Sequence, residues 1–304
     1  MLAKFNSLIE MMKSIPDEQA AIDHIRAIRW KNGAFCPHCG ATKVYHFSDG
    51  RNHKCGECRK RFSIRVGTIF EDSKLPLRKW LLAIWLITSH KKGIASTQLA
   101  KDIGITQKSA WFVTQRLREA ARTQSFNRPL TDEVESDETF IGGKEKNKHA
   151  SKRTGGKQGG KGKIAVLGML ERGGELRTMV TPSLRKGDVQ GALRGNIGKG
   201  AAVFTDEHPA FNGLSGDYAH HRVNHSAGEY VRHYIIHTNG IESVWALFKR
   251  QIVGTHHYLS PKHIGRYLSE MTWRFNARSM EEGERVNALI AQTTGRLTYK
   301  ELIA

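Results

Sequence analysis

The chain lacks long apolar runs and has few cysteines, and both absences restrict what it can be. None of its 304 residues belongs to an apolar run near membrane-spanning length, so no membrane partner is expected. The N-terminus contains Glu10, Asp17 and Glu18, which a secretory signal peptide would not carry. We therefore expect a cytoplasmic protein. The four cysteines all lie between positions 36 and 58, and in a reducing compartment such a cluster indicates a metal site rather than disulfides.

Acidic residues are also scarce compared with basic ones. The chain has 48 Lys and Arg against 29 Asp and Glu, a formal net charge of +19. This excess is spread along the sequence and predicts a polyanionic partner, most simply nucleic acid. A soluble protein that is merely basic is the alternative.

Two C-x2-C pairs separated by fifteen residues stand in CPHCGATKVYHFSDGRNHKCGEC, residues 36–58. Four thiolates complete a closed tetrahedral zinc site, and strand-like runs around Asp49-Gly50 predict a hairpin. These features predict a zinc ribbon; two matched pairs without a thioredoxin-like context argue against a redox C-x-x-C. The zinc would be structural, and its predicted ligands are Cys36, Cys39, Cys55 and Cys58.

Residues 76–122 are predicted to be helical, and their second half has the pattern of a helix-turn-helix. Ser96 and Thr106 are expected to begin two helices, with Gly104 in the turn between them. An ordinary helical hairpin is the alternative, but the basic charge and the neighbouring ribbon favour DNA binding. Side chains suited to contact bases and phosphates are expected to be exposed at Gln107, Lys108, Trp111, Gln115 and Arg118.

An acidic strand is predicted after a linker at residues 123–131. In DEVESDETFIGG the side chains of Glu133, Glu135 and Asp137 alternate, so a strand would place them on one face. An exposed edge strand is one interpretation, and a face that binds divalent metal is the other. Residues 142–163 hold seven Gly, seven Lys and one Arg, from which no core can be built. We expect a basic loop there that lies on phosphates, with Lys157 and Lys161 among its DNA contacts.

The remaining strands alternate with helices. Residues 164–183 predict a hairpin around Gly173-Gly174, and a short helix over 184–197 follows. A buried strand then ends on Asp206, the position where sites form in open α/β sheets. His208 beside it is either a metal neighbour or a loop histidine, and we favour the loop. YAHHRVNH, residues 218–225, predicts a last strand.

The segment HTNGIESVWALFKRQIVG, residues 237–254, predicts an amphipathic helix. Glu242 lies in its first turn and Lys249 two turns later, so both can share one face. Alone, this indicates no more than a solvated glutamate. With Asp137 and Asp206, however, Glu242 completes three carboxylates on three elements, which a ribonuclease-H-like sheet would bring together. Carboxylates are the oxygen ligands that Mg²⁺ accepts in phosphoryl transfer on DNA.

These motifs in this order resemble the zinc-ribbon insertion-sequence transposases with an ISXO-type DDE catalytic domain, over nearly the whole chain. The motifs are CPHC…CGEC, the helix-turn-helix, VESDETFIGG, VFTDEHPAF and HTNGIESVWALFKRQIVGTHHYLS. The resemblance implies an α/β fold with a ribonuclease-H-like mixed five-stranded sheet. It implies that Asp137, Asp206 and Glu242 bind Mg²⁺ or Mn²⁺, with Lys249 as the accompanying basic residue. Asn239 is an alternative third ligand, but the seven-residue step to Lys249 favours Glu242.

The implied activity is cleavage of double-stranded DNA at the terminal inverted repeats, followed by attack of the freed 3′-OH on target DNA. Two ends must be held together, so a homo-oligomer on DNA in the nucleoid is expected. A DNA-binding regulator with a degenerate core and a nuclease that cuts without joining are the rival functions. The expected divisions are a helical lead-in (1–30), the ribbon (31–72), the helix-turn-helix (73–124), the catalytic domain (125–280) and a peripheral tail (281–304).

Overall fold

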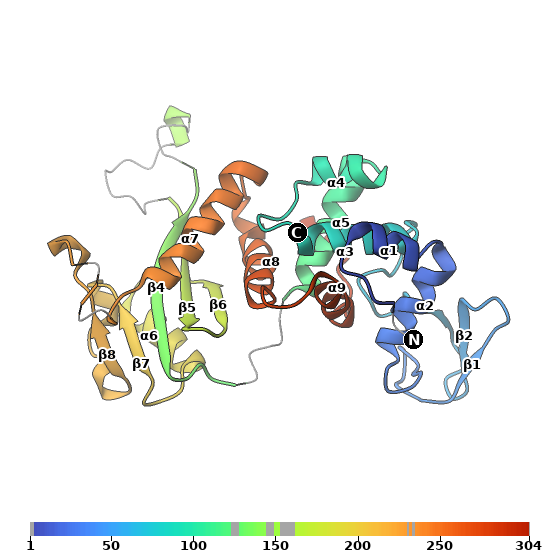
Figure 1. Ribbon diagram of the computed structural model, residues 1–304, viewed down its shortest axis with the longest axis horizontal. Coiled ribbons are helices and arrows are strands. Elements are labelled where there is room, and N and C mark those ends of the chain that lie inside the picture. Colours follow the sequence, from blue (N-terminus) through green and yellow to red (C-terminus); the bar gives the residue numbers. More distant parts are fainter. Residues whose placement is uncertain are drawn as a thin grey trace. The chain divides into compact units, whose positions relative to one another are not determined.

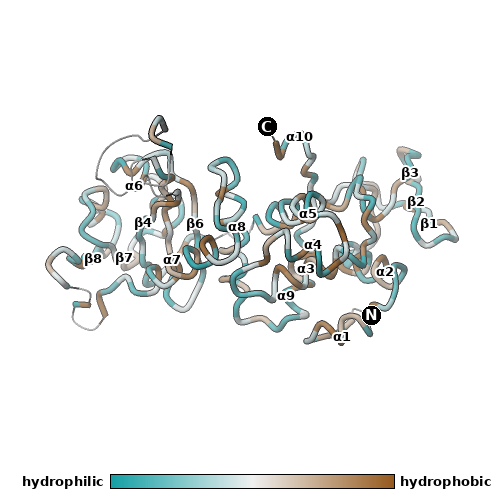
Figure 2. Tube along the Cα trace, turned by 90° about the horizontal axis from the view of Figure 1, so that it is seen from above, coloured by the Kyte–Doolittle hydropathy of each residue, from teal (hydrophilic) through white to brown (hydrophobic). Residues whose placement is uncertain are grey.

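The computed structural model describes residues 3–122, 128–143, 149–152, 162–229, 231–232 and 235–303. The chain divides into two compact units, and each is treated separately. Unit 1 comprises residues 1–122 and 277–304, and unit 2 comprises residues 123–276. Figure 2 shows hydrophobic stretches on both units, in keeping with a separate core in each. Within the described ranges, no helix is both long enough and apolar enough to span a bilayer.

Unit 1 begins with the predicted helical lead-in and zinc ribbon. Helices α1 (Leu8–Ser14) and α2 (Glu18–Arg29) come first, and the side chain of Asp17 caps α2 by accepting a hydrogen bond from the Ala20 N–H at 2.8 Å. Three short antiparallel strands follow in the order β1-β2-β3, with Gly50 at φ 65° in the first turn. They are β1 (Val44–His46), β2 (Asn52–Cys55) and β3 (Arg61–Ser63).

The rest of unit 1 is helical and includes the end of the chain. Helix α3 (Leu77–Ser89) precedes α4 (Ser96–Ile103) and α5 (Gln107–Ala120), and α9 (Glu282–Ala291) and α10 (Tyr299–Ile303) come last. Helix α4 ends at Gly104 in the left-handed conformation, and the Thr106 hydroxyl caps α5. Val286, Leu289 and Ile290 of α9 are buried, and the Ile69 N–H donates to the Thr293 carbonyl at 2.9 Å. The C-terminal segment that we expected to be peripheral is therefore part of the core of unit 1.

Unit 2 is a five-stranded mixed sheet in the order β6-β5-β4-β7-β8 (Figure 1). Strands β4 to β6 form an antiparallel meander, whereas β7 and β8 add to the other side of β4 in parallel. This is the predicted ribonuclease-H-like arrangement. The strands are β4 (Glu133–Ile141), β5 (Ile164–Glu171), β6 (Leu176–Val180), β7 (Ala202–Thr205) and β8 (Ala219–Arg222). Two 3₁₀ turns, Pro209–Phe211 and Leu214–Gly216, link β7 to β8.

Helices cover both faces of the sheet. Val134, Leu167 and Val203 pack against α6 (Lys186–Asn196) on one face. Val166 and Leu170 pack on the other face against Trp245 and Phe248 of α7 (Asn239–Gln251) and against α8 (Ile264–Asn276). Alternate residues of β4 and β5 therefore point into different cores, as the period of a strand requires.

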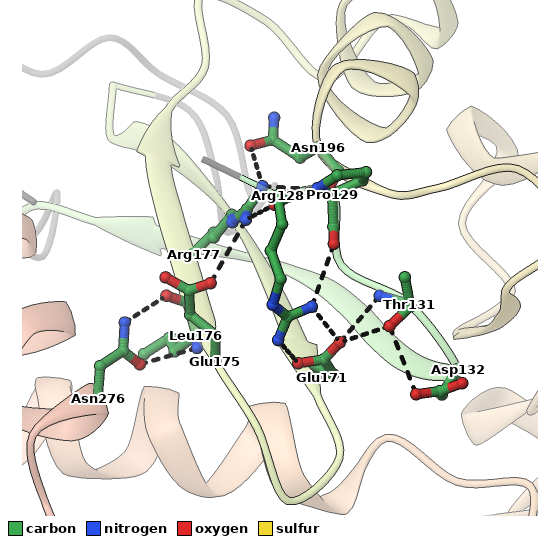
Figure 3. A network of polar contacts seen from close by, with 10 residues as sticks. All are labelled: Arg128, Pro129, Thr131, Asp132, Glu171, Glu175, Leu176, Arg177, Asn196 and Asn276. Carbon is green, nitrogen blue, oxygen red and sulfur yellow. Dashed lines mark hydrogen bonds and ion pairs between the residues drawn. The ribbon is translucent and has the colours of Figure 1, made fainter. Parts of the chain in front are cut away.

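An ionic network fixes the entry to β4 (Figure 3). Arg128 donates two parallel hydrogen bonds to the carboxylate of Glu171 at the end of β5, and the Thr131 N–H donates to it at 2.9 Å. These donors, the Arg128 guanidinium first, lower the pKa of Glu171 to about 2. Asn276, the last residue of α8, pairs its side-chain amide with both backbone groups of Leu176 on the edge strand β6. The sheet is thus tied to its flanking segments at two points.

Glu171→Gln is expected to lower the free energy of unfolding by about 1–3 kcal/mol at pH 7, because its charge-assisted bonds are lost. The pKa of Glu171 is depressed in the folded state, from an ordinary value of 4.5 to about 2. Its contribution is therefore fully present above about pH 4.5 and fades as the pH falls toward 2. Urea denaturation of both proteins at pH 7 and pH 3 measures this, with the exposed Glu133→Gln as control. Equal losses at both pH values would contradict a role for the charge.

Candidate active site and zinc site

The acidic residues of β4 do not share one environment, although they share one face. Glu133 is half-exposed, whereas the carboxylate of Glu135 is 1% exposed and accepts hydrogen bonds from Arg172 Nε and the Ile241 N–H, both at 2.9 Å. Glu135 thereby ties β4 to the first turn of α7 and serves the structure. The exposed-edge interpretation of this strand is wrong, because β4 lies between β5 and β7.

Two glycines let α7 lie close to the sheet. A Cβ atom on Gly168 would lie 2.4 Å from Trp245 Cζ2, and one on Gly240 would lie 2.8 Å from Glu135 Oε2. Gly168 stands opposite Asp137 in the register of β4 and β5. The tight contact of Trp245 with Gly168 therefore sets how far the first turn of α7, which carries Glu242, stands from Asp137.

Gly168→Ala is expected to lower the free energy of unfolding by about 1–3 kcal/mol, because the buried Trp245 ring must move to admit the methyl group. Thermal unfolding checks this. Gly191→Ala in α6 is the matched control: its Cβ would have nothing within 4 Å, so helix propensity predicts a slight stabilisation. A Gly168 variant as stable as this control would show that the close contact does not constrain α7.

Asp137, Glu138 and Asp206 form a carboxylate cluster in which one oxygen from each lies within 4.8 Å of the others. Burial raises the pKa of Asp137 to about 7, with smaller contributions from the charges of Asp206 and Glu242. Burial likewise raises the pKa of Glu138 to about 8, with Asp206 and Asp137 next in effect. The carboxylate oxygens of the cluster are the hard donors that divalent cations prefer. A bound cation would also offset the repulsion between their negative charges.

Asp206 reaches the cluster because it follows β7 directly. Its Oδ1 accepts a hydrogen bond from the His208 N–H at 2.9 Å, which holds the carboxylate at the strand end. His208 lies in the loop after β7, and its Nδ1 accepts a hydrogen bond from the Ala210 N–H. Its Nε2 also lies 3.9 Å from Glu138 Oε1, so it borders the cluster as well.

Sequence reasoning missed Glu138, because strand alternation places it on the opposite face from Asp137. Pairing between β4 and β7 ends at Glu135 opposite Phe204. Beyond this point the β7 side of β4 is open, so the adjacent side chains of Asp137 and Glu138 both approach Asp206. The sequence feature that could have identified Glu138 is the pair of consecutive acidic residues, Asp137 and Glu138, in the second half of β4. The neighbouring strand β7 has only four residues and so cannot pair with this half.

Glu242, the third predicted carboxylate, is not among the three residues whose oxygens lie within 4.8 Å of one another, and it is held by other partners. Its Oε1 accepts a hydrogen bond from Thr238 Oγ1 at 2.9 Å and lies 3.3 Å from His225 Nε2. The His225 N–H in turn donates to Glu207 at 2.9 Å, and hydrogen bonds led by the Ser226 hydroxyl lower the pKa of Glu207 to about 2. Lys249 is exposed two turns further along α7. Asn239 is exposed at the start of α7, and its carbonyl accepts from Ser243 Oγ.

The four cysteines of the ribbon converge. Their sulfur atoms lie within 4.8 Å of one another, with 3.7 Å between Cys36 and Cys58 and 3.6 Å between Cys39 and Cys55. A tetrahedral ZnS₄ site with Zn–S bonds of about 2.3 Å has S···S separations of about 3.8 Å. Backbone N–H groups of His38, Glu57 and Cys58 point at the sulfurs of Cys36 and Cys55. The arrangement fits the predicted structural zinc.

The predicted DNA-contacting residues of α5 divide into two groups. Gln107 and Lys108 are exposed and Trp111 is partly exposed. Gln115 and Arg118 are buried, at 0% and 1% exposure, so their expected exposure is wrong. The second half of α5 lies inside unit 1, where the neighbouring Arg116 donates to carbonyls of Ile69, Glu71 and Leu297. Lys157 and Lys161 fall outside the described residues.

Two family models match ranges of this chain that contain the carboxylate cluster and the four cysteines. A family model described as the ISXO2-like transposase domain matches residues 129–276, and one described as the transposase zinc-ribbon domain matches residues 16–61. The uncharacterized protein in transposable element ISH50 of Halobacterium salinarum is 29% identical over 273 residues, which cover 84% of this chain and 90% of that protein.

Solved complexes of Mos1 transposase are also among the similar proteins. The pre-cleavage transpososome is 10% identical, covers 72% of this chain and 80% of its own, and has a TM-score of 0.25. The strand transfer complex is 11% identical, covers 72% and 79%, and has the same TM-score of 0.25.

Proposed function

We propose that this chain, an insertion-sequence transposase that combines a zinc ribbon with an ISXO2-like DDE domain, binds the terminal inverted repeats of its element and catalyses DNA cleavage and strand transfer. The observation that carries the proposal is the carboxylate cluster at the end of β7, inside the matched catalytic domain. Cleavage frees a 3′-OH, and this hydroxyl attacks target DNA by direct phosphoryl transfer. Joining requires two ends at once, so the active form is an oligomer on DNA.

Asp137, Asp206 and Glu242 would hold the divalent cations, Mg²⁺ or Mn²⁺. Bound cations would offset the negative charge that develops on the attacking and leaving oxygens. Glu242 must leave its contacts with Thr238 and His225, or share them, to act as a ligand. It remains our choice over Asn239, because its charge already acts on Asp137. Lys249 would contact a phosphate beside the site.

DNA recognition is assigned to unit 1. The exposed Gln107 and Lys108 lie in the first turn of α5, and the partly exposed Trp111 follows at the start of the second turn. A recognition helix contacts base edges with its N-terminal residues. The zinc ribbon adds basic residues on short strands, and zinc would keep these strands folded. The net charge of +19 supports phosphate binding along the chain.

The test is a cleavage and joining assay with DNA that carries the element's own ends, with and without Mg²⁺. Mg²⁺-dependent joined products from the wild-type protein would support the proposal. Cleavage without joining would favour the nuclease. Tight binding of the ends without any cutting would favour the DNA-binding regulator and overturn the proposal.

A further inference from the structure

Helix α7 does not end in a simple cap. Its last turn widens into a π-helical segment, Ile252–His256, and His257 follows at φ 59° and ψ −42°. A non-glycine residue in this region costs free energy, and π turns within helices are often found at functional sites. Such a turn persists only where its surroundings hold it.

A buried polar network on α8 holds this turn. Gln251 is 0% exposed, and its Oε1 accepts a hydrogen bond from Arg274 Nη2 at 2.8 Å. Arg274 also pairs with the buried Glu270. Gln251 Nε2 lies 3.3 Å from His256 Nε2, and the His256 ring packs edge-on against Tyr267 with centroids 4.8 Å apart. The turn is therefore fixed to α8 from inside.

The outer side of the turn presents apolar side chains to solvent. Val253 is 71% exposed and Tyr258 is 68% exposed, whereas Lys249 and Arg250 lie exposed on the preceding turn. Tyr258, two residues after this turn, and the cations Lys249 and Arg250, which precede the turn on α7, are thus all exposed on one short segment of chain. Single-stranded nucleic acid is bound by such a combination, with rings for bases and cations for phosphates.

We propose that the ring of Tyr258 stacks on an unpaired base of the DNA strand that leaves the catalytic cluster, while Lys249 and Arg250 bind its phosphates. This inference rests on the proposed transposase function. From Glu242 to Gln251 the helix rises by about 14 Å. The contacted base therefore lies a few nucleotides from the scissile phosphate. A paired base within a duplex offers no free face, so the base is unpaired.

The test uses the full-length protein and cleaved element ends whose single-stranded extension carries 5-iododeoxyuridine at one position from 1 to 8. Ultraviolet cross-linking followed by mass spectrometry of the peptides locates the contact. We expect a cross-link to Tyr258 for one or two adjacent positions. Affinity for the extended end should fall roughly tenfold in Tyr258→Ala, as expected for one lost stacking contact, and remain near wild type in Tyr258→Phe.

Fully paired ends are the control substrate, and their affinity should change less than twofold in Tyr258→Ala. Cross-links found only outside residues 252–258, or equal affinity of wild type and Tyr258→Ala for extended ends, would overturn the inference. Either result can occur while the wild-type protein still cleaves and joins DNA. The inference can therefore be wrong while the proposed function remains supported. If the wild type neither cleaves nor joins, the proposed function itself fails and the inference falls with it.

Discussion

Asp206→Ala is expected to reduce Mg²⁺-dependent cleavage and joining by at least about 10³-fold. The charge stabilisation that a catalytic cation supplies is worth several kcal/mol, and each 1.36 kcal/mol corresponds to a tenfold rate. Asp206 belongs to the cluster with Asp137 and Glu138, so its loss would remove one of the proposed metal ligands. Affinity for the ends should stay within about threefold of wild type, because the residues proposed to recognise DNA lie in unit 1. A gel assay of cleaved and joined products, with binding measured on the same DNA, checks both expectations.

Glu133→Gln is the matched control for this variant. Glu133 begins the same strand as Asp137, but it is half-exposed and pairs only at 3.3 Å with Arg172. It should cleave and join at nearly the wild-type rate. Full activity in Asp206→Ala would remove the carboxylate cluster from the reaction, whereas equal losses in both variants would point to a general effect of acidic charge on this strand.

The second large effect is expected in the zinc ribbon. Cys55→Ser should abolish zinc binding and unfold the ribbon strands β1 to β3, because the buried residues of their hydrophobic cluster are Cys36, Cys55 and Phe62. Such a small core cannot replace a structural zinc, whose apparent binding free energy is about 10–16 kcal/mol. Element ends should then bind weakly or not at all. Zinc content by atomic emission and amide hydrogen exchange across the ribbon measure the two consequences.

His38→Ala serves as the control in the ribbon, since His38 lies between two of the cysteines but is not needed to complete the tetrahedral set. It should retain one zinc per chain and protected amides. A Cys55→Ser protein that still binds zinc stoichiometrically, or whose ribbon amides remain protected without zinc, would contradict a closed four-cysteine site.

Much of the fold could be predicted because its signals are local. The cysteine spacing sets the ribbon, and Gly50 and Gly173 mark hairpin turns that the structure contains. Asp206 was identified because it follows a short apolar strand, which the sheet then buries. These features depend on residues that are close in sequence, so no long-range contact had to be known.

The features that were missed depend on distant contacts. Gln115 and Arg118 have polar side chains at positions that face solvent in an isolated helical pair, but α5 is enclosed within unit 1 beyond its first turns. Glu138 joins the cluster because β7 is shorter than β4, which nothing near Glu138 in the sequence reveals. The apolar face of α9 can be recognised from the sequence, but no nearby residue indicates which elements of unit 1 it packs against.

The return of the chain to unit 1 also affects the order in which the protein can fold. Unit 2 is a single stretch of chain, so it can fold as soon as α8 has been synthesised. Helix α9 begins at residue 282, whereas α3 ends at residue 89. At 5–20 residues per second, synthesis of the intervening chain takes roughly 10–40 s. During this time the apolar side chains of α3 lack their contacts with α9. Unit 1, which is proposed to recognise DNA, is therefore complete only after unit 2, which is proposed to cut DNA.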